Sequence, residues 1–164
     1  MDGSTVGRMA VELELRRSHD DRRRYVVDGV GSLRYGSWFS RRAELMPVGG
    51  PALTAQPRGV MSRSAVAVTA AGVPVGEFAQ SRRLTHGGEV TWRGRSLTLR
   101  SEAVLTSRYS LLDGTSVALE VRASGWGRTR ARLTLGTELL EPGLVLFALW
   151  VVQDFLAQDS SSGG

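Results

Sequence analysis

Apolar and polar residues alternate along most of the 164-residue chain. Residues 8–17 (RMAVELELRR) place four apolar side chains on one side of an extended chain and two glutamates on the other. This period of two is typical of a half-buried β-strand. Short strands separated by glycine turns such as Asp28-Gly29 and Asp113-Gly114 predict an antiparallel barrel or sandwich. Similar patterns predict strands over residues 24–27, 30–35, 37–45, 63–69, 75–80, 89–93, 95–100, 104–112, 115–122 and 129–135.

The end of the chain has a different pattern. Glu141-Pro142 is typical of a helix start, because proline in the first turn loses no hydrogen bond there. Residues 144–156 (LVLFALWVVQDFL) are apolar on every side as far as Val152. A helix that is apolar all round must be buried or lie in a membrane. The run is too short for a bilayer, which needs about 20 apolar residues, so we expect no transmembrane segment.

The helix therefore needs an apolar wall around it. Strands closing into a barrel around the helix meet this need directly, and that is the fold we predict. The alternative is a sandwich with the helix clamped against one open end. In the barrel the large side chains of the helix are core and line no cofactor pocket, and Trp38 and Trp92 pack within their strands. The core residues predicted for the helix are Phe147, Leu149, Trp150 and Phe155.

Composition removes several kinds of chemistry. All 21 basic residues are Arg, and Lys, Asn, Ile and Cys are absent. This bias is typical of a GC-rich genome, which we expect to be bacterial. Without Lys there is no Schiff base or phosphate-loop lysine, and without Cys no disulfide or thiolate. Gly29-Val-Gly31 is followed by Arg34 where a dinucleotide motif needs glycine. We predict no cofactor and no metal site.

Charge is distributed unevenly. The formal net charge is +5, but residues 1–132 carry 21 Arg against 12 acidic residues, whereas residues 133–164 carry four acidic residues and no Arg. One interpretation is an anion-binding surface. The other is that Arg does ordinary surface work, paired with scattered acids. The candidate ligand-binding residues are Arg22, Arg23, Arg24, Arg82, Arg83, Trp126, Arg128 and Arg130.

Trp126 is a special case among these candidates, because it lies between two glycines beside Arg128. A tryptophan in a basic loop suits a membrane interface, and it equally suits the closing of a barrel mouth. The acid pair Asp20-Asp21 precedes Arg22–Arg24, and we interpret it as local ion pairing in an exposed turn rather than as an acid–base pair.

Three segments and the terminal helix resemble the tubby C-terminal-like superfamily, which includes LURP-one-related proteins and phospholipid scramblases. The segments are residues 108–121 (RYSLLDGTSVALEV), 66–78 (VAVTAAGVPVGEF) and 90–99 (VTWRGRSLTL). The resemblance implies a small bacterial member, with a closed antiparallel β-barrel of about a dozen strands around a central hydrophobic C-terminal helix. The resemblance covers residues 6–159, which we predict to form one domain. The termini at 1–5 and 160–164 are predicted to be flexible, since residues 160–164 contain only Ser and Gly. Eukaryotic tubby proteins bind phosphoinositides through basic side chains, but no motif here maps those residues, so none is carried over.

These observations favour a non-enzymatic module that binds anionic ligands, such as phosphoinositide-like or other acidic lipid head groups, through surface Arg. The alternative is a protein-interaction or structural scaffold domain with a protein partner. A hydrolase-type enzyme using His19 or His86 ranks third, because neither histidine has a sequence neighbour that completes a catalytic or metal motif. We do not expect nucleic acid as a partner, and we expect the protein to be cytoplasmic.

Overall fold

The computed structural model describes residues 11–37, 40–58, 64–81, 87–103, 107–124, 129–136 and 139–162. These residues form a mainly β structure, a closed antiparallel barrel with one helix. The strands are β1 (Val11–Arg17), β2 (Arg24–Val27), β3 (Gly31–Tyr35), β4 (Ala43–Pro47), β5 (Leu53–Arg58), β6 (Ser64–Thr69), β7 (Pro74–Gln80), β8 (Gly87–Trp92), β9 (Arg95–Ala103), β10 (Arg108–Asp113), β11 (Ser116–Ala123) and β12 (Thr129–Leu135), and the helix is α1 (Pro142–Ser162).

Each strand pairs with its neighbours in the chain, and the ring closes where β1 pairs with β12. Closure removes the open sheet edges that a sandwich would leave, so the predicted barrel is confirmed and the sandwich is wrong. In the closing pair Leu13 lies opposite Leu133, and Leu15 lies opposite Ala131. Leu15, Ala131 and Leu133 are fully buried, because alternate residues of each strand face the interior.

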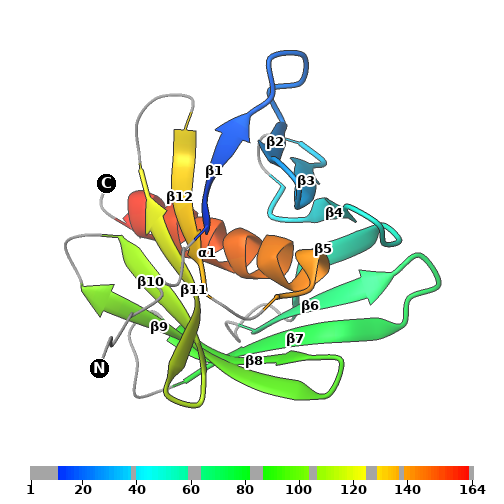
Figure 1. The fold of residues 1–164 in the computed structure, drawn as a ribbon. Coiled ribbons are helices and arrows are strands. Elements are labelled where there is room, and N and C mark those ends of the chain that lie inside the picture. The colour runs from blue at the N-terminus through cyan, green and yellow to red at the C-terminus, as the bar shows by residue number, and fades with distance from the viewer. Residues whose placement is uncertain are drawn as a thin grey trace, which may run out of the picture.

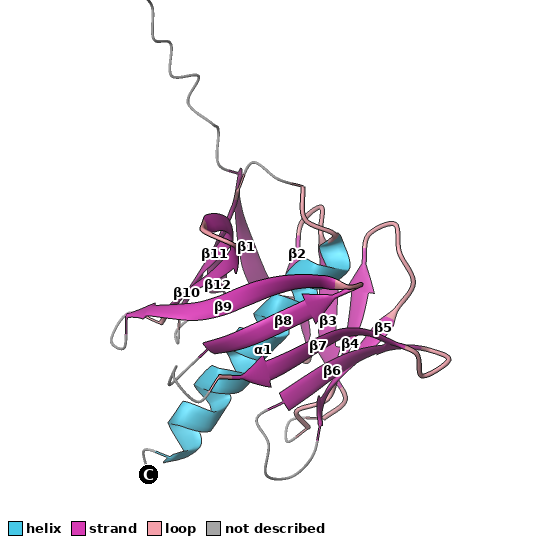
Figure 2. Ribbon diagram, turned by 90° about the horizontal axis from the view of Figure 1, so that it is seen from below, coloured by secondary structure: helices cyan, strands magenta, loops and turns pink. Residues whose placement is uncertain are grey.

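Helix α1 lies inside the ring of strands (Figures 1 and 2). Every residue from Leu144 to Val152 is at most 2% exposed, which the all-round apolar pattern predicted. The four large side chains predicted as helix core are buried, and so is Trp92. Trp38 lies outside the described residues. The helix continues to Ser162.

Three parts of the strand prediction were wrong. The strand expected over residues 37–45 begins only at Ala43, where β4 starts, and residues 40–42 belong to the β3–β4 connection. Strand β5 was not predicted, because Pro57 and the neighbouring glycines and prolines favour a loop; its inward residues Leu53 and Ala55 are nevertheless buried. Gly87 and Gly88 were expected to form a turn but lie within β8. A Cβ on Gly88 would lie 2.1 Å from the Ala79 carbonyl oxygen, so this glycine permits the close approach of β7 and β8.

The barrel has two distinct ends. Because neighbouring strands are antiparallel, odd-numbered strands end and even-numbered strands begin at the same end. We call it the exit end, since α1 leaves the barrel there and Asp154 of the helix is ion-paired with Arg41, just before β4. The opposite end is the entry end, where Glu141 precedes α1 and accepts a hydrogen bond from Trp92 at the end of β8.

Candidate functional site

Most arginines in the described part of the chain have a carboxylate partner. Five of the 21 arginines (Arg8, Arg63, Arg82, Arg83 and Arg128) lie outside the described residues, which leaves 16. Ten of these lie within 4.0 Å of a carboxylate oxygen, so much of the arginine content does ordinary paired surface work. The ten are Arg16, Arg34, Arg41, Arg58, Arg93, Arg95, Arg100, Arg108, Arg122 and Arg132.

The remaining six form no ion pair with any residue that the structure describes, and we call them the exit-end arginines: Arg17, Arg22, Arg23, Arg24, Arg42 and Arg130. All six lie at the exit end. They occupy the end of β1, the β1–β2 connection, the start of β2, the residue before β4 and the start of β12. These elements belong to four strands, β12, β1, β2 and β4, which together with β3 form one contiguous stretch of the ring. Among the described arginines, those without an ion-pair partner are therefore concentrated on one sector of one end.

Three of the exit-end arginines keep an N–H group without a hydrogen-bond partner. The Nε atoms of Arg17, Arg24 and Arg130 are buried and make no hydrogen bond. The guanidinium carbon of Arg130 lies 5.9 Å from the centroid of the Tyr25 ring, within the range of a cation–π contact. Arg17 is the register partner of Tyr25 on the neighbouring strand. Buried donors without partners carry a cost in stability.

A pocket of about 210 Å³ opens beside the exit-end arginines. It lies between the β1–β2 connection, the β3–β4 connection and the last turns of α1. Its lining combines three guanidinium groups with two tyrosines, two serines and three helix residues. The lining residues are Arg22, Arg23, Arg41, Tyr25, Tyr35, Ser37, Ser40, Gln153, Asp154 and Ala157. We call it the exit pocket.

The β1–β2 connection is held by Asp21. Its carboxylate accepts hydrogen bonds from Arg34 Nε at 2.6 Å and from the backbone N–H of Arg23 at 3.0 Å. The Arg34 bond is the main cause that lowers the pKa of Asp21. We predicted ion pairing between the acid pair and the adjacent arginines, but the partner is Arg34, on β3. Arg22 and Arg23 form no ion pair in the described part of the chain, and Arg23 interacts with the Asp21 charge only at longer range.

The β3–β4 connection is tied to the helix. Arg41 donates two hydrogen bonds to Asp154, from Nε at 2.7 Å and from Nη2 at 2.5 Å. Trp150 Nε1 donates to the carbonyl oxygen of Arg41 at 2.8 Å. A bidentate guanidinium–carboxylate pair fixes the plane of both groups. One wall of the exit pocket is thus anchored to the barrel core.

Two tyrosines form the inner wall of the exit pocket. The rings of Tyr25 and Tyr35 pack edge to face, with centroids 6.0 Å apart and planes at 88°. Burial raises the pKa of the Tyr35 hydroxyl, and the neighbouring Tyr25 and Asp154 raise it further. Tyr35 therefore stays neutral at physiological pH, and both rings offer apolar surface beside the arginines.

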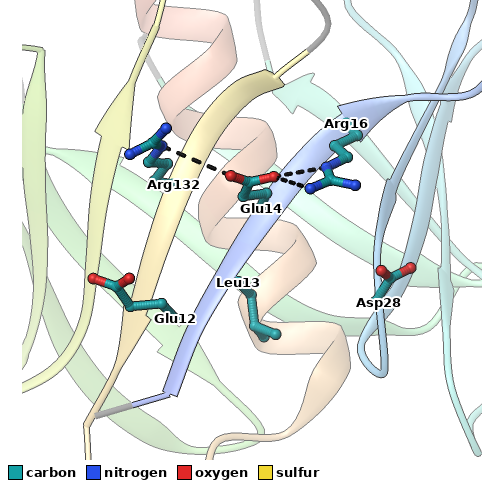
Figure 3. Close-up of a pocket in the computed structure, with 6 residues that line it drawn as sticks. All are labelled: Glu12, Leu13, Glu14, Arg16, Asp28 and Arg132. Carbon is teal, nitrogen blue, oxygen red and sulfur yellow. Dashed lines mark hydrogen bonds and ion pairs between the residues drawn. The ribbon is translucent and has the colours of Figure 1, made fainter.

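A second pocket, of about 340 Å³, lies on the outer side of β1 and β12 (Figure 3). Its lining residues are Glu12, Leu13, Glu14, Arg16, Asp28 and Arg132. Glu14 accepts a hydrogen bond from Arg16 Nε at 2.7 Å and lies 3.8 Å from Arg132 Nε. Both arginines are thus neutralised by one carboxylate, with two further acids nearby, so this pocket does not favour anions. No cluster of metal-ligating side chains occurs among the residues that the structure describes.

The structure brings together half of the candidate ligand-binding residues. Arg22 and Arg23 line the exit pocket, Arg130 contacts the Tyr25 ring, and Arg24 begins β2 at the same end. The other four candidates, Arg82, Arg83, Trp126 and Arg128, lie outside the described residues, as does His86. His19 lies in the β1–β2 connection and makes contacts of its own.

Arg17, Arg41 and Arg42 were not among the candidates. Their sequence signal is the doublet: Arg16-Arg17 ends one strand, and Arg41-Arg42 precedes another. In each doublet one arginine is ion-paired, Arg16 with Glu14 and Arg41 with Asp154, and the other has no carboxylate partner in the described part of the chain. Sequence alone does not tell the two members apart.

Comparisons with protein families, curated proteins and solved structures found no match to this chain. The resemblance to the tubby C-terminal-like superfamily therefore stays a prediction, and the argument about function rests on the geometry of the exit end. Within the described residues, no helix has the length and apolar character needed to cross a bilayer.

Proposed function

We propose that this protein is a non-enzymatic binding module for anionic ligands, with acidic lipid head groups of the phosphoinositide-like class as the ligand and the exit-end arginines as the contact surface. One observation carries the proposal. Ten of the 16 described arginines are neutralised by carboxylates, while the six without such partners all lie on one sector of one barrel end.

A concentration of positive charge attracts an anionic surface. Arginine suits this role because its guanidinium group donates up to five hydrogen bonds in a planar fork that matches phosphate oxygens. Each basic residue close to an anionic membrane contributes about 1 kcal/mol of binding free energy. The interior of the barrel is occupied by α1, with Leu144 to Val152 buried, so a ligand of this class has to bind at the outer surface or at an end.

Vesicle flotation tests the proposal. We expect the protein to float with vesicles of phosphatidylcholine containing an acidic phospholipid, to stay behind with pure phosphatidylcholine, and to be released as salt rises, because salt screens exposed charges. Replacing Arg22, Arg23 and Arg42 together by Gln should lower the affinity for acidic vesicles by on the order of 100-fold.

A second triple variant distinguishes the effect of where the arginines lie from the effect of net charge. Replacing Arg93, Arg95 and Arg132 by Gln removes the same number of charges, but these three arginines are ion-paired with Glu141, Asp113 and Glu14. We expect this variant to bind acidic vesicles nearly as well as the unchanged protein. Equal losses in the two triple variants would show that only net charge matters. Absence of binding to acidic vesicles at low salt would overturn the proposal.

A further inference from the structure

We propose that the exit pocket binds the phosphate monoester group of a small ligand that also has a compact apolar body. The inference rests on the proposed function in one respect, since it uses the same barrel end. Beyond the proposed function, it assigns one defined binding site, the exit pocket, within the positively charged surface of the exit-end arginines. The pocket is bounded by two connections between strands and by the helix, so a ligand in it meets groups that are far apart in the sequence.

Charge favours a dianion. Three arginines and one aspartate line the exit pocket, for a formal lining charge of +2. A phosphate monoester carries about −1.5 to −2 at neutral pH, whereas a carboxylate carries −1. Arg41 is already engaged by Asp154 in the bidentate pair. Arg22 and Arg23 form no ion pair with a described carboxylate, although Asp21 lies close enough to Arg23 for their charges to interact. Together these two arginines offer the charge for one phosphate monoester.

The donors around this charge are partly fixed before any ligand binds. Arg23 Nη1 donates to the Gly36 carbonyl oxygen at 2.6 Å, and its backbone N–H is held by Asp21. Ser40 Oγ accepts the backbone N–H of Arg42 at 3.1 Å, which shapes the β3–β4 connection. Groups held in place in this way lose less entropy on binding. Arg22 and the Ser37 hydroxyl make no hydrogen bond to a described residue and are the donors left for the ligand.

The volume and the apolar lining of the exit pocket indicate what the part of the ligand beyond the phosphate group is like. A volume of about 210 Å³ compares with about 30 Å³ for one water in the liquid, so the pocket takes a phosphate group plus a small body. Tyr25 and Tyr35 present ring surface, and Ala157 of the helix contributes a methyl group. A flat or short apolar body fits against these three side chains while the phosphate faces Arg22 and Arg23.

Phenyl phosphate is a suitable probe, and isothermal titration calorimetry measures its binding to the full chain. We expect one saturable site, with benzoate bound at least 10-fold more weakly because it carries a single charge. Ala157→Trp fills the pocket without changing charge at an exposed position of the helix, and it should weaken phenyl phosphate binding at least 10-fold. Ala70→Trp places the same side chain in the exposed β6–β7 turn at the entry end and should leave binding unchanged. Circular dichroism checks that both variants fold.

Flotation of the same variants on acidic vesicles separates this inference from the proposed function. We expect Ala157→Trp to float like the unchanged protein, since the exit-end arginines are retained. Unaltered phenyl phosphate binding by Ala157→Trp, or no saturable binding by the unchanged protein, would overturn the pocket and leave vesicle binding standing. Equal affinity for benzoate would overturn the choice of a phosphate monoester. Binding of phenyl phosphate without binding to acidic vesicles would support the pocket and remove the lipid from the proposed function.

Discussion

The two ends of the barrel differ in what they expose. At the entry end lie the exposed large apolar side chains of the described residues, in turns and at strand ends: Val11, Met46, Val48, Val73, Val117 and Leu139. At the exit end lie the six exit-end arginines, which have no ion pair with a described residue. The alternating direction of the strands produces this separation, because every second connection is brought to the same end. Loops far apart in the chain thus share one chemical character.

The ends also differ in how they hold the helix. At the entry end Glu141 accepts hydrogen bonds from Trp92 Nε1 at 2.8 Å and from Arg93 Nε at 2.9 Å. A Cβ on Gly143 would lie 2.9 Å from the Trp92 ring, so helix and strand are in close contact. At the exit end the helix projects beyond the strands (Figure 2) and is joined to the β3–β4 connection through Asp154. The entry end is thus closed by packing, while the exit end keeps a pocket.

The substitution with the largest expected effect on stability unfolds the whole barrel, including both ends. Trp150 is 1% exposed at the centre of the helix that links them. Trp150→Asp buries an unpaired carboxylate, which costs several kcal/mol against a total stability of about 5–15 kcal/mol. We expect no folded protein, measured by circular dichroism and thermal melting. A soluble variant with an unchanged melting temperature would show that the helix is peripheral.

A pair of substitutions compares the two attachments of the helix. Glu141→Ala leaves the indole N–H of the buried Trp92 without its partner, and we expect a loss of about 1–3 kcal/mol in the free energy of unfolding. Asp154→Ala removes an ion pair whose Arg41 side chain is half exposed and remains hydrated, so the loss should be about 1 kcal/mol or less. Urea denaturation measures both. A larger loss for Asp154→Ala than for Glu141→Ala would contradict our inference that the helix is held more strongly at the entry end.

Removing one positive charge should raise the free energy of unfolding at the exit end and lower it at the entry end. Arg22→Gln and Arg42→Gln each relieve repulsion within the exit-end arginines, and we expect a gain of a few tenths of a kcal/mol in low salt. Arg93→Gln removes the ion pair with Glu141 and should cost a similar amount. Because these charges are exposed, the differences should shrink at high salt. Destabilisation by all three substitutions would contradict the idea of unrelieved repulsion at the exit end.

The smallest effect concerns pH at the exit end. The Arg34 hydrogen bond and the Arg23 backbone N–H lower the pKa of Asp21 from its usual value. The folded pKa is therefore below that of the unfolded chain, about 3.9, and the stabilising contribution of Asp21 is present above that pH and is lost as pH falls through the folded pKa. Carboxyl-carbon NMR titration should show the lowered pKa, and Arg34→Gln should return it toward the usual value. An ordinary pKa in the unchanged protein would argue against a fixed β1–β2 connection.

Local signals predicted much of the fold. Alternation in residues 8–17 predicted the strand that begins the barrel, and glycine turns at Gly29 and Gly114 have the positive φ angles that such turns need. Strand β5 was missed because Pro57 is unfavourable for a strand on local evidence, yet its neighbours Leu53 and Ala55 find an apolar interior to pack against. Tertiary burial outweighed local preference there.

The candidate site was less predictable. Arg22 and Arg23 were chosen from their cluster, and they line the exit pocket. Asp154 and Tyr35, which shape the same pocket, carried no sequence signal, because they reach it from the helix and from another strand. Residues that are distant in the chain meet only when the barrel closes.

The sequence by itself determined the class of fold, because short amphipathic strands and one helix that is apolar on every side have few ways to bury their surfaces. It also determined that every cation is an arginine. Only the tertiary structure decided which arginines are neutralised. Arg34 pairs with Asp21 across 13 residues and Arg41 with Asp154 across 113 residues, and such pairs depend on strand register and closure of the ring. The exit-end arginines are the described arginines that this pairing leaves without an ion-pair partner.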